Sequence, residues 1–212
     1  MLRRVRVAAL LLPVALGCSA IPGVDDGGTG PEPGNSIVRQ DSLSFLRADP
    51  AAPPLADRLM SFWAVRGKTR EIRLMYRPRA GAPDSVEFAR FRVDARSLIN
   101  DSAGNPIAQG DSVLITVGVA DTLGLITEFQ PAGLVFSAAQ PARLWLKFGE
   151  ADDDLNDDGS VNAADTTALH SLAIWKQEHA GEPWSRLPST VDTRAQDVEA
   201  AIPGFTRFAV AY

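Results

Sequence analysis

Apolar and polar residues alternate along much of the chain, and this alternation constrains the fold more than any other feature of the sequence. In DSVLITVGV (111–119) and in ARLWLKF (142–148), every second residue is apolar. Successive side chains of a β-strand point to opposite faces, so a period of two places all the apolar residues on one face. The pattern therefore predicts strands that are buried on one side only.

Eight further stretches are expected to form strands, and turn signals rich in Gly, Pro and Asn separate many of them. They cover residues 42–47, 59–67, 70–77, 85–93, 125–130, 172–177, 197–202 and 205–212. Short strands spaced in this way favour an antiparallel β-sandwich, which we expect over residues 37–212. Only AADTTALHSL (163–172) is expected to be helical, with Asn162 or Asp165 as its cap.

The first seventeen residues, MLRRVRVAALLLPVALG, have the features of a secretory signal peptide. An Arg-rich start precedes an apolar run that is too short to span a bilayer. The next residue, Cys18, is the single cysteine of the chain. Residues 15–18 (Ala-Leu-Gly-Cys) resemble the lipobox of bacterial lipoproteins, which implies lipidation of Cys18 and attachment to a membrane. The alternative is an ordinary signal cleavage that leaves Cys18 as a free thiol.

Residues 19–36 are rich in Gly and Pro and show no apolar periodicity, so residues 18–36 are expected to be a lipidated Cys and a flexible tether. The protein is then expected to be exported to a bacterial cell envelope. In Gram-negative lipoproteins a residue other than Asp after the Cys, here Ser19, implies the outer membrane or the cell surface. Loss of the signal peptide removes three Arg and leaves an acidic chain, which argues against nucleic acid as a partner.

The stretch DLNDDGSVNAAD, residues 154–165 and hereafter the acidic loop, has the spacing of an EF-hand calcium loop. Such a loop takes oxygen ligands from positions 1, 3, 5, 7, 9 and 12, with Gly at position 6. With Gly159 in sixth place, Val161 falls eighth and is expected to turn inward. The expected ligands are Asp154, Asn156, Asp158, Ser160 through its carbonyl, Asn162 through water, and Asp165.

The acidic loop resembles the calcium repeat of dockerins, in which the final ligand is Asp. The resemblance implies one Ca²⁺ ion with a structural role, because carboxylates gathered in a loop repel one another until a cation neutralises them. Dockerins pair two such loops, whereas the loop occurs once in this sequence. The alternative interpretation is an ordinary solvated turn, since Asp and Gly are common turn residues.

From about residue 59 the chain resembles ZU5-like domains of bacterial surface lipoproteins. The resemblance rests on residues 128–148 (EFQPAGLVFSAAQPARLWLKF) and 183–212, which end in GFTRFAVAY. It implies a β-sandwich in which the acidic loop is an insertion. Some relatives cleave themselves at His-Phe-Ser, and the matching residues here are Gly204, Phe205 and Thr206. Because Gly204 supplies no base, we expect no self-cleavage and place Phe205 in the core.

No arrangement of residues selects a catalytic site, so the chain is predicted not to be an enzyme. His170 and His179 are expected to lie at the surface, and most of the four tryptophans are expected to pack in the core. The favoured hypothesis is a non-catalytic, membrane-anchored lipoprotein that binds an unknown protein or glycan ligand or helps to organise the envelope. The alternatives are a dockerin-like module that docks a partner through the loop and, less favoured, a self-cleaving or hydrolytic enzyme.

Overall fold

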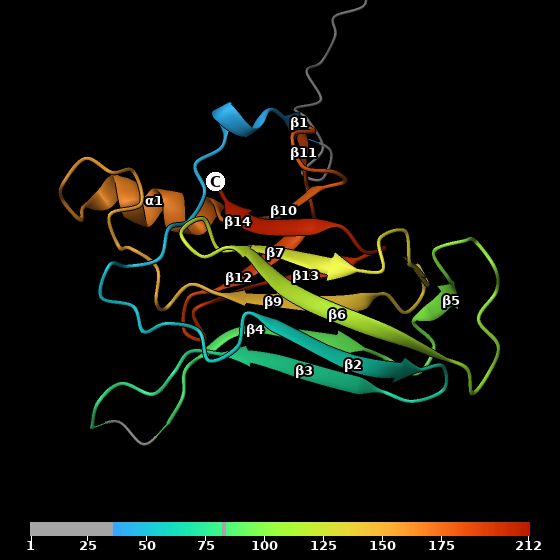
Figure 1. The fold of residues 1–212 in the computed structure, drawn as a ribbon. Helices are drawn as coiled ribbons and strands as arrows, with labels where there is room; N and C mark the ends of the chain where they lie inside the picture. The colour runs from blue at the N-terminus through green and yellow to red at the C-terminus, as the bar shows by residue number, and fades with distance from the viewer. Residues whose placement is uncertain (1–35, 82–83) are drawn as a thin grey trace, which may run out of the picture. The chain divides into compact units, whose positions relative to one another are not determined.

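The computed structural model describes residues 36–81 and 84–212, which form antiparallel sheets with one α-helix (Figure 1). The larger sheet has seven strands. In spatial order these are β1 (Ile37–Val38), β11 (Trp184–Arg186), β10 (Ala173–Gln177), β14 (Arg207–Ala211), β7 (Ile126–Gln130), β6 (Ser112–Asp121) and β2 (Leu59–Val65). The antiparallel β-sandwich expected from the sequence is therefore the fold observed.

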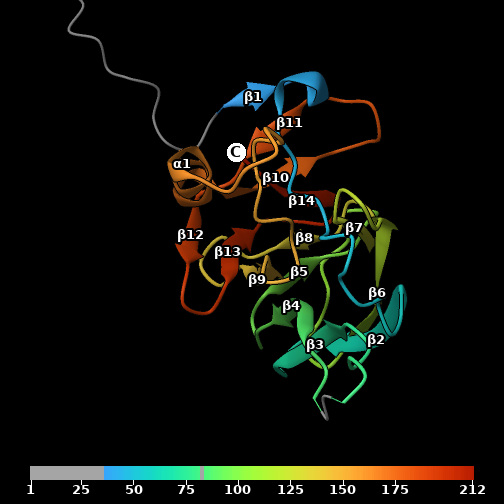
Figure 2. The same ribbon diagram turned by 90° about the vertical axis from the view of Figure 1, so that its left-hand side faces the viewer.

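The second sheet has five strands and faces the first. Its order is β12 (Ser189–Asp192), β13 (Asp197–Ile202), β9 (Ala142–Lys147), β4 (Glu87–Val93) and β3 (Arg70–Met75). The short strands β5 (Leu98–Asn100) and β8 (Val135–Phe136) form a separate pair, and a 3₁₀ turn, η1, covers Gln40–Ser42. Figure 2 shows the two larger sheets from a direction turned by 90°.

The main core lies between these two sheets and is built from the apolar face of each strand. On β4, Phe91 is fully buried, and its ring lies 5.0 Å from the ring of Phe129 on β7. Phe205 is 3% exposed and packs against both rings, which confirms its predicted place in the core. The apolar residues that alternate along the strands therefore contact one another between the two sheets.

A second, smaller core covers the outer face of the seven-stranded sheet. Trp175 and Trp184 are buried there, and Phe45 packs edge-on against Trp184 with 5.2 Å between ring centroids. Residues 42–47 were expected to form a strand, but they make only an isolated bridge from Phe45 to Ala211. The segment covers the sheet face with its aromatic ring instead of extending the sheet.

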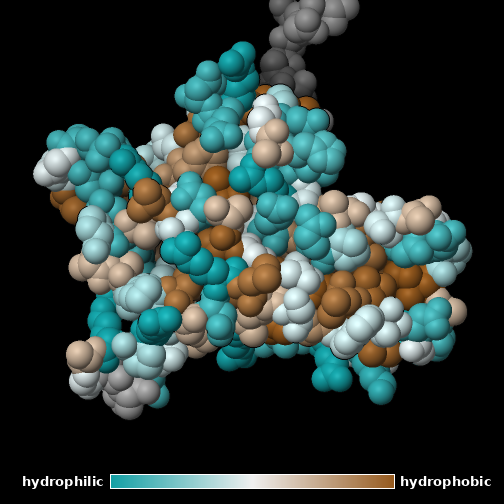
Figure 3. All heavy atoms as spheres, viewed as in Figure 1, coloured by the Kyte–Doolittle hydropathy of each residue, from teal (hydrophilic) through white to brown (hydrophobic). Residues whose placement is uncertain are grey.

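The remaining two tryptophans do not follow the expectation of core packing. Trp63 on β2 is 58% exposed, because it points to the outer face near an edge of the sheet. Trp145 on β9 is half-buried and lies under the guanidinium of Arg90, 4.4 Å from the ring centroid. Hydrophobic residues also gather over the region of β6 in Figure 3.

The acidic loop and helix α1 (Ala163–Ser171) connect β9 of one sheet with β10 of the other. His170 and His179 are exposed, as predicted. Within the described residues, no helix has the length and apolarity needed to cross a membrane. The expected signal peptide, Cys18 and nearly all of the tether lie outside the described residues.

Candidate functional site

The first half of the acidic loop is organised around the carboxylate of Asp154. The backbone N–H of Gly159 donates to one oxygen of Asp154 at 2.7 Å, and the N–H of Asp158 donates to the other at 3.2 Å. These bonds fold the chain back over five residues. Gly159 has a φ of +85°, a left-handed conformation that glycine adopts without a steric penalty. The sixth position thus makes the sharp turn predicted from the sequence.

Polar groups from three ligand positions surround the carboxylate of Asp158. The Ser160 hydroxyl donates to it at 2.8 Å, and the side-chain amides of Asn156 and Asn162 donate at 3.0 Å and 3.1 Å. These hydrogen bonds, that of Ser160 first, lower the pKa of the Asp158 carboxyl. The carboxylate is therefore held in its ionised form.

Asp165, in twelfth position, joins the end of the loop to helix α1. Its carboxylate accepts from the backbone N–H of Asn162 at 2.8 Å and from that of Asn156 at 3.2 Å. Asn162 in turn accepts from Ala164 N–H at 2.7 Å, which completes a capping box. The backbone N–H of Asn162 is the main cause of the lowered pKa of Asp165, which is itself buried.

Residues far away in the sequence hold the acidic loop against the sandwich. The Arg47 side chain forms an ion pair with Asp157 at 2.8 Å. The backbone carbonyl of Arg47 accepts from the N–H of Asp152 at 2.8 Å. The hydroxyl of Tyr212, the last residue of the chain, donates to the carbonyl of Leu155. Sequence reasoning missed Arg47 and Tyr212, since spacing within a loop carries no signal for contacts across more than fifty residues.

One expectation for the loop is wrong. Val161, in eighth position, is 68% exposed and belongs to neither core. An inward apolar residue needs a surface to pack on, and in paired loops the second loop offers one. The acidic loop occurs once in this chain, so Val161 stays at the surface.

All the expected ligand residues lie within one short turn, and all their candidate donor atoms are oxygens. Oxygen donors of this kind suit a hard cation such as Ca²⁺. Across residues 36–81 and 84–212, however, no three His, Cys, Asp or Glu side chains are gathered closely enough to hold a metal ion by themselves. The expected set contains three such side chains, those of Asp154, Asp158 and Asp165, and in this structure they do not form such a group.

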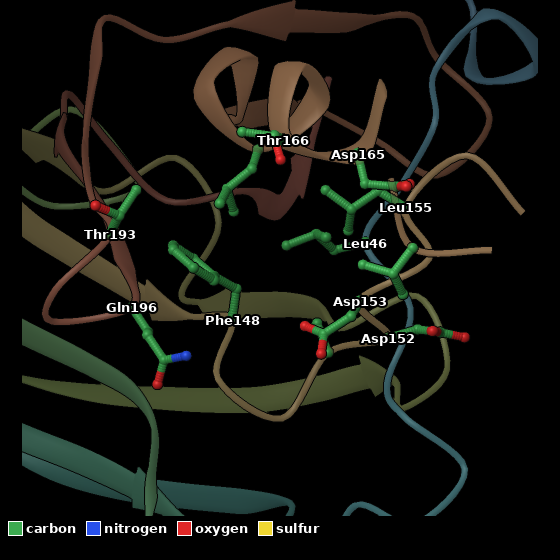
Figure 4. Close-up of a pocket in the computed structure, with 12 residues that line it drawn as sticks. Leu46, Phe148, Asp152, Asp153, Leu155, Asp165, Thr166, Thr193 and Gln196 are labelled. Atoms are coloured by element: carbon green, nitrogen blue, oxygen red, sulfur yellow. The ribbon is translucent and has the colours of Figure 1, made fainter. Parts of the chain in front are cut away.

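A cavity of about 330 Å³ lies between α1, the acidic loop and the adjacent end of the sandwich (Figure 4). Helix α1 contributes Thr166 and Leu169, and the turn between β12 and β13 contributes Thr193 and Gln196. Hydrophilic residues cover much of the outside of α1 and the loop in Figure 3. The lining of the cavity is mixed, because apolar residues such as Leu46 and Phe148 stand beside polar ones such as Asp153 and Thr193.

The residues that the ZU5-like resemblance aligns with the self-cleaving motif are packed closely against neighbouring backbone. Thr206 is buried, and its hydroxyl donates to the carbonyl of Gln177. A Cβ placed on Gly204 would lie 2.6 Å from the carbonyl oxygen of Leu134, so the backbone leaves no room for a histidine there. The arrangement favours a structural role for this segment.

The chain was compared with protein-family models, curated proteins and solved structures, and it matches none of them. The ZU5-like and dockerin-like resemblances therefore stay predictions from the sequence, whereas the antiparallel β-sandwich rests on the observed strand order.

Proposed function

We propose that this chain is a non-catalytic, membrane-anchored lipoprotein of a bacterial envelope whose β-sandwich is stabilised by one structural Ca²⁺ ion. The observation that carries the proposal is the acidic loop, in which Asp154, Asp158 and Asp165 are fixed by backbone N–H or side-chain hydrogen bonds. The signal-like N-terminus and Cys18 support export and anchoring. Its envelope role is to present the sandwich for binding to a protein or glycan.

The residues of the loop fit a calcium ion in kind and in number. The ligands would be Asp154, Asn156, Asp158, the Ser160 carbonyl, Asn162 through water, and Asp165. The lowered pKa values of Asp158 and Asp165 keep these carboxylates charged, as cation binding requires. The bound ion would supply no chemistry beyond neutralising the charge and ordering the loop.

Calcium should raise the melting temperature of the protein. An ion that binds only the folded state stabilises it by about 2.7 kcal/mol when present at a hundred times its Kd. The measurement is thermal unfolding, followed by circular dichroism, in millimolar CaCl₂ and in excess chelator. Magnesium should substitute poorly, because it demands a tight octahedral shell. An unchanged melting temperature in calcium would show that the loop is only an acidic turn.

Two neighbouring aspartates offer a matched pair of variants. Asp158→Asn removes a ligand carboxylate and should abolish the calcium response. Asp157→Asn makes the same chemical change at a position outside the ligand set, where φ is +60° and Asn is also tolerated. It removes only the exposed ion pair to Arg47, so its calcium response should match that of the parent. Equal responses in both variants would contradict the proposed ligands.

A further inference from the structure

The cavity beside α1 has the size and lining of a small-molecule site. Its volume of about 330 Å³ falls at the lower end of the range of known ligand pockets. Apolar side chains from the N-terminal segment, from the residue after β9, from the acidic loop and from α1 line its interior. They are Leu46, Phe148, Ala151, Leu155, Val161 and Leu169. An aliphatic or aromatic group of a ligand would therefore be removed from water there.

The charges around the cavity have one sign. Its lining includes Asp152, Asp153 and Asp165 but no Lys, Arg or His. Asp152 accepts from Asp154 N–H at 3.1 Å, and Asp165 accepts from the N–H groups of the loop, so both carboxylates are turned toward the loop. Figure 4 shows the carboxylates of Asp152 and Asp165 directed away from the cavity.

Asp153 differs from these two neighbours. Its carboxylate is turned into the cavity in Figure 4. Among the described hydrogen bonds and ion pairs, those of residues 36–81 and 84–212, none involves the side chain of Asp153. An exposed negative charge, without a partner among the described residues, therefore lies at the edge of the cavity. A cationic group would complement this charge, whereas an anionic group would be repelled.

The opposite side of the cavity is formed by the turn between β12 and β13. Gln196 has a φ of +53°, a conformation that costs energy for a residue other than glycine. Its carbonyl accepts from Phe148 N–H at 2.9 Å, which fixes the turn to the residue that lines the cavity. Gln196 and Thr193, both exposed, place polar side chains on the side of the cavity opposite Asp153 (Figure 4).

We infer that this cavity binds a small amphipathic cation, a primary amine that carries an aliphatic or aromatic group. The apolar group lies among Leu46, Phe148 and Leu169, and the ammonium group pairs with Asp153. The inference goes beyond the proposed function, and the residue assigned to the ammonium group, Asp153, lies outside the six expected calcium ligands.

The probe is n-hexylammonium chloride, with hexan-1-ol and hexanoate as comparisons of equal chain length. Each is titrated into the purified full-length chain at one fixed calcium concentration, and binding is followed by amide chemical shifts in ¹H–¹⁵N spectra. Hexylammonium should bind about three- to fivefold more tightly than hexan-1-ol, as expected for an exposed ion pair. Shifts should centre on α1 and Asp153. Equal affinity for hexylammonium and hexanoate would overturn the inference.

Three variants separate the cavity from unspecific binding. Asp153→Asn should remove the preference for the amine over the alcohol, whereas Asp152→Asn should keep it, because that carboxylate points away. Thr166→Trp adds bulk to an exposed helix position and should weaken binding of both probes without disturbing the fold. All three should keep their calcium-dependent melting, so failure here is distinguishable from failure of the calcium proposal. Retention of the preference in Asp153→Asn would refute the assigned role.

Discussion

Two tyrosines illustrate how differently one residue type can contribute to stability. The hydroxyl of Tyr76 is buried and has no hydrogen-bond partner among the described residues. Burial, and then the charge of Glu150, raise the pKa of Tyr76 to about 12. Tyr212, in contrast, donates its hydroxyl to the Leu155 carbonyl at the base of the acidic loop. The Tyr76 hydroxyl has lost its hydrogen bonds to water and gained none in the protein. The Tyr212 hydroxyl has exchanged a hydrogen bond to water for one to the Leu155 carbonyl.

Replacing these tyrosines by Phe should therefore have opposite effects on the free energy of unfolding. Tyr76→Phe keeps the ring that packs edge-on against Phe88 and removes an unpaired polar group, so stability should be unchanged or higher by about 1 kcal/mol. Tyr212→Phe leaves the Leu155 carbonyl without its donor and should lower stability by about 1 kcal/mol. Urea denaturation midpoints measure both. A marked loss of stability in Tyr76→Phe would mean that its hydroxyl has a partner.

The longer elements could be predicted from the sequence, and the shortest could not. Strands such as β6 and β9 show the period of two because one face of each is more deeply buried than the other. Elements of two to four residues, such as β8 and β12, are too short to display any period. Helix α1 could be predicted from its N-cap. The side chain of Asn162 makes the capping hydrogen bond, and Asn is a preferred residue at that position.

The same difference applies to the candidate site. The spacing of oxygen-bearing residues around Gly159 identified the acidic loop, since those contacts are local. The Arg47 and Tyr212 contacts to the loop, and the cavity beside α1, depend on chain segments brought together only by the complete fold. Spacing within a motif therefore predicts what a loop can bind but not what holds the loop in place.

The turn after β5 should contribute stability that depends on pH. Asp101 accepts from the side chain of Asn105 at 3.1 Å and from its backbone N–H at 2.8 Å, and these bonds lower the pKa of Asp101. A carboxyl whose pKa is lower in the folded state stabilises the protein above its unfolded pKa of about 3.9. That contribution is lost as the pH falls through the folded pKa.

Asp101→Asn should flatten the acid limb of the stability profile. Urea unfolding is measured between pH 6 and pH 2.5 in the presence of chelator, so that calcium makes no contribution. The parent should lose stability more steeply than the variant below about pH 4, because only the parent has this carboxylate to protonate. Parallel profiles for the two proteins would show that the Asp101 turn does not contribute to acid sensitivity.

At the scale of the whole molecule, the strand order could not be obtained from the sequence. β2 pairs with β6 and β14 pairs with β7, although each pair is separated by several other elements. The alternation of apolar and polar residues predicts which face of a strand is buried, but it does not predict which strand pairs with it. Phe45 shows the same limit, because it packs on the outer face of the seven-stranded sheet against Trp184 and bridges to Ala211, both far along the chain.

The proposed anchor concerns the whole molecule, and it should depend on one atom, the sulfur of Cys18. If a lipid is attached there, the protein expressed with its native N-terminus in a bacterial host should sediment with membranes. Cys18→Ser removes the thiol that would be acylated and should move the protein to the soluble fraction, whereas the neighbouring Ser19→Ala should leave it with membranes.

One acyl group gives only marginal membrane binding, so stable sedimentation also requires the multiple chains of a lipoprotein anchor. Mass spectrometry of the membrane-bound form should show the corresponding mass on the peptide that begins at Cys18. If Cys18→Ser sediments like the parent, attachment is through the folded part and the anchor proposal is wrong.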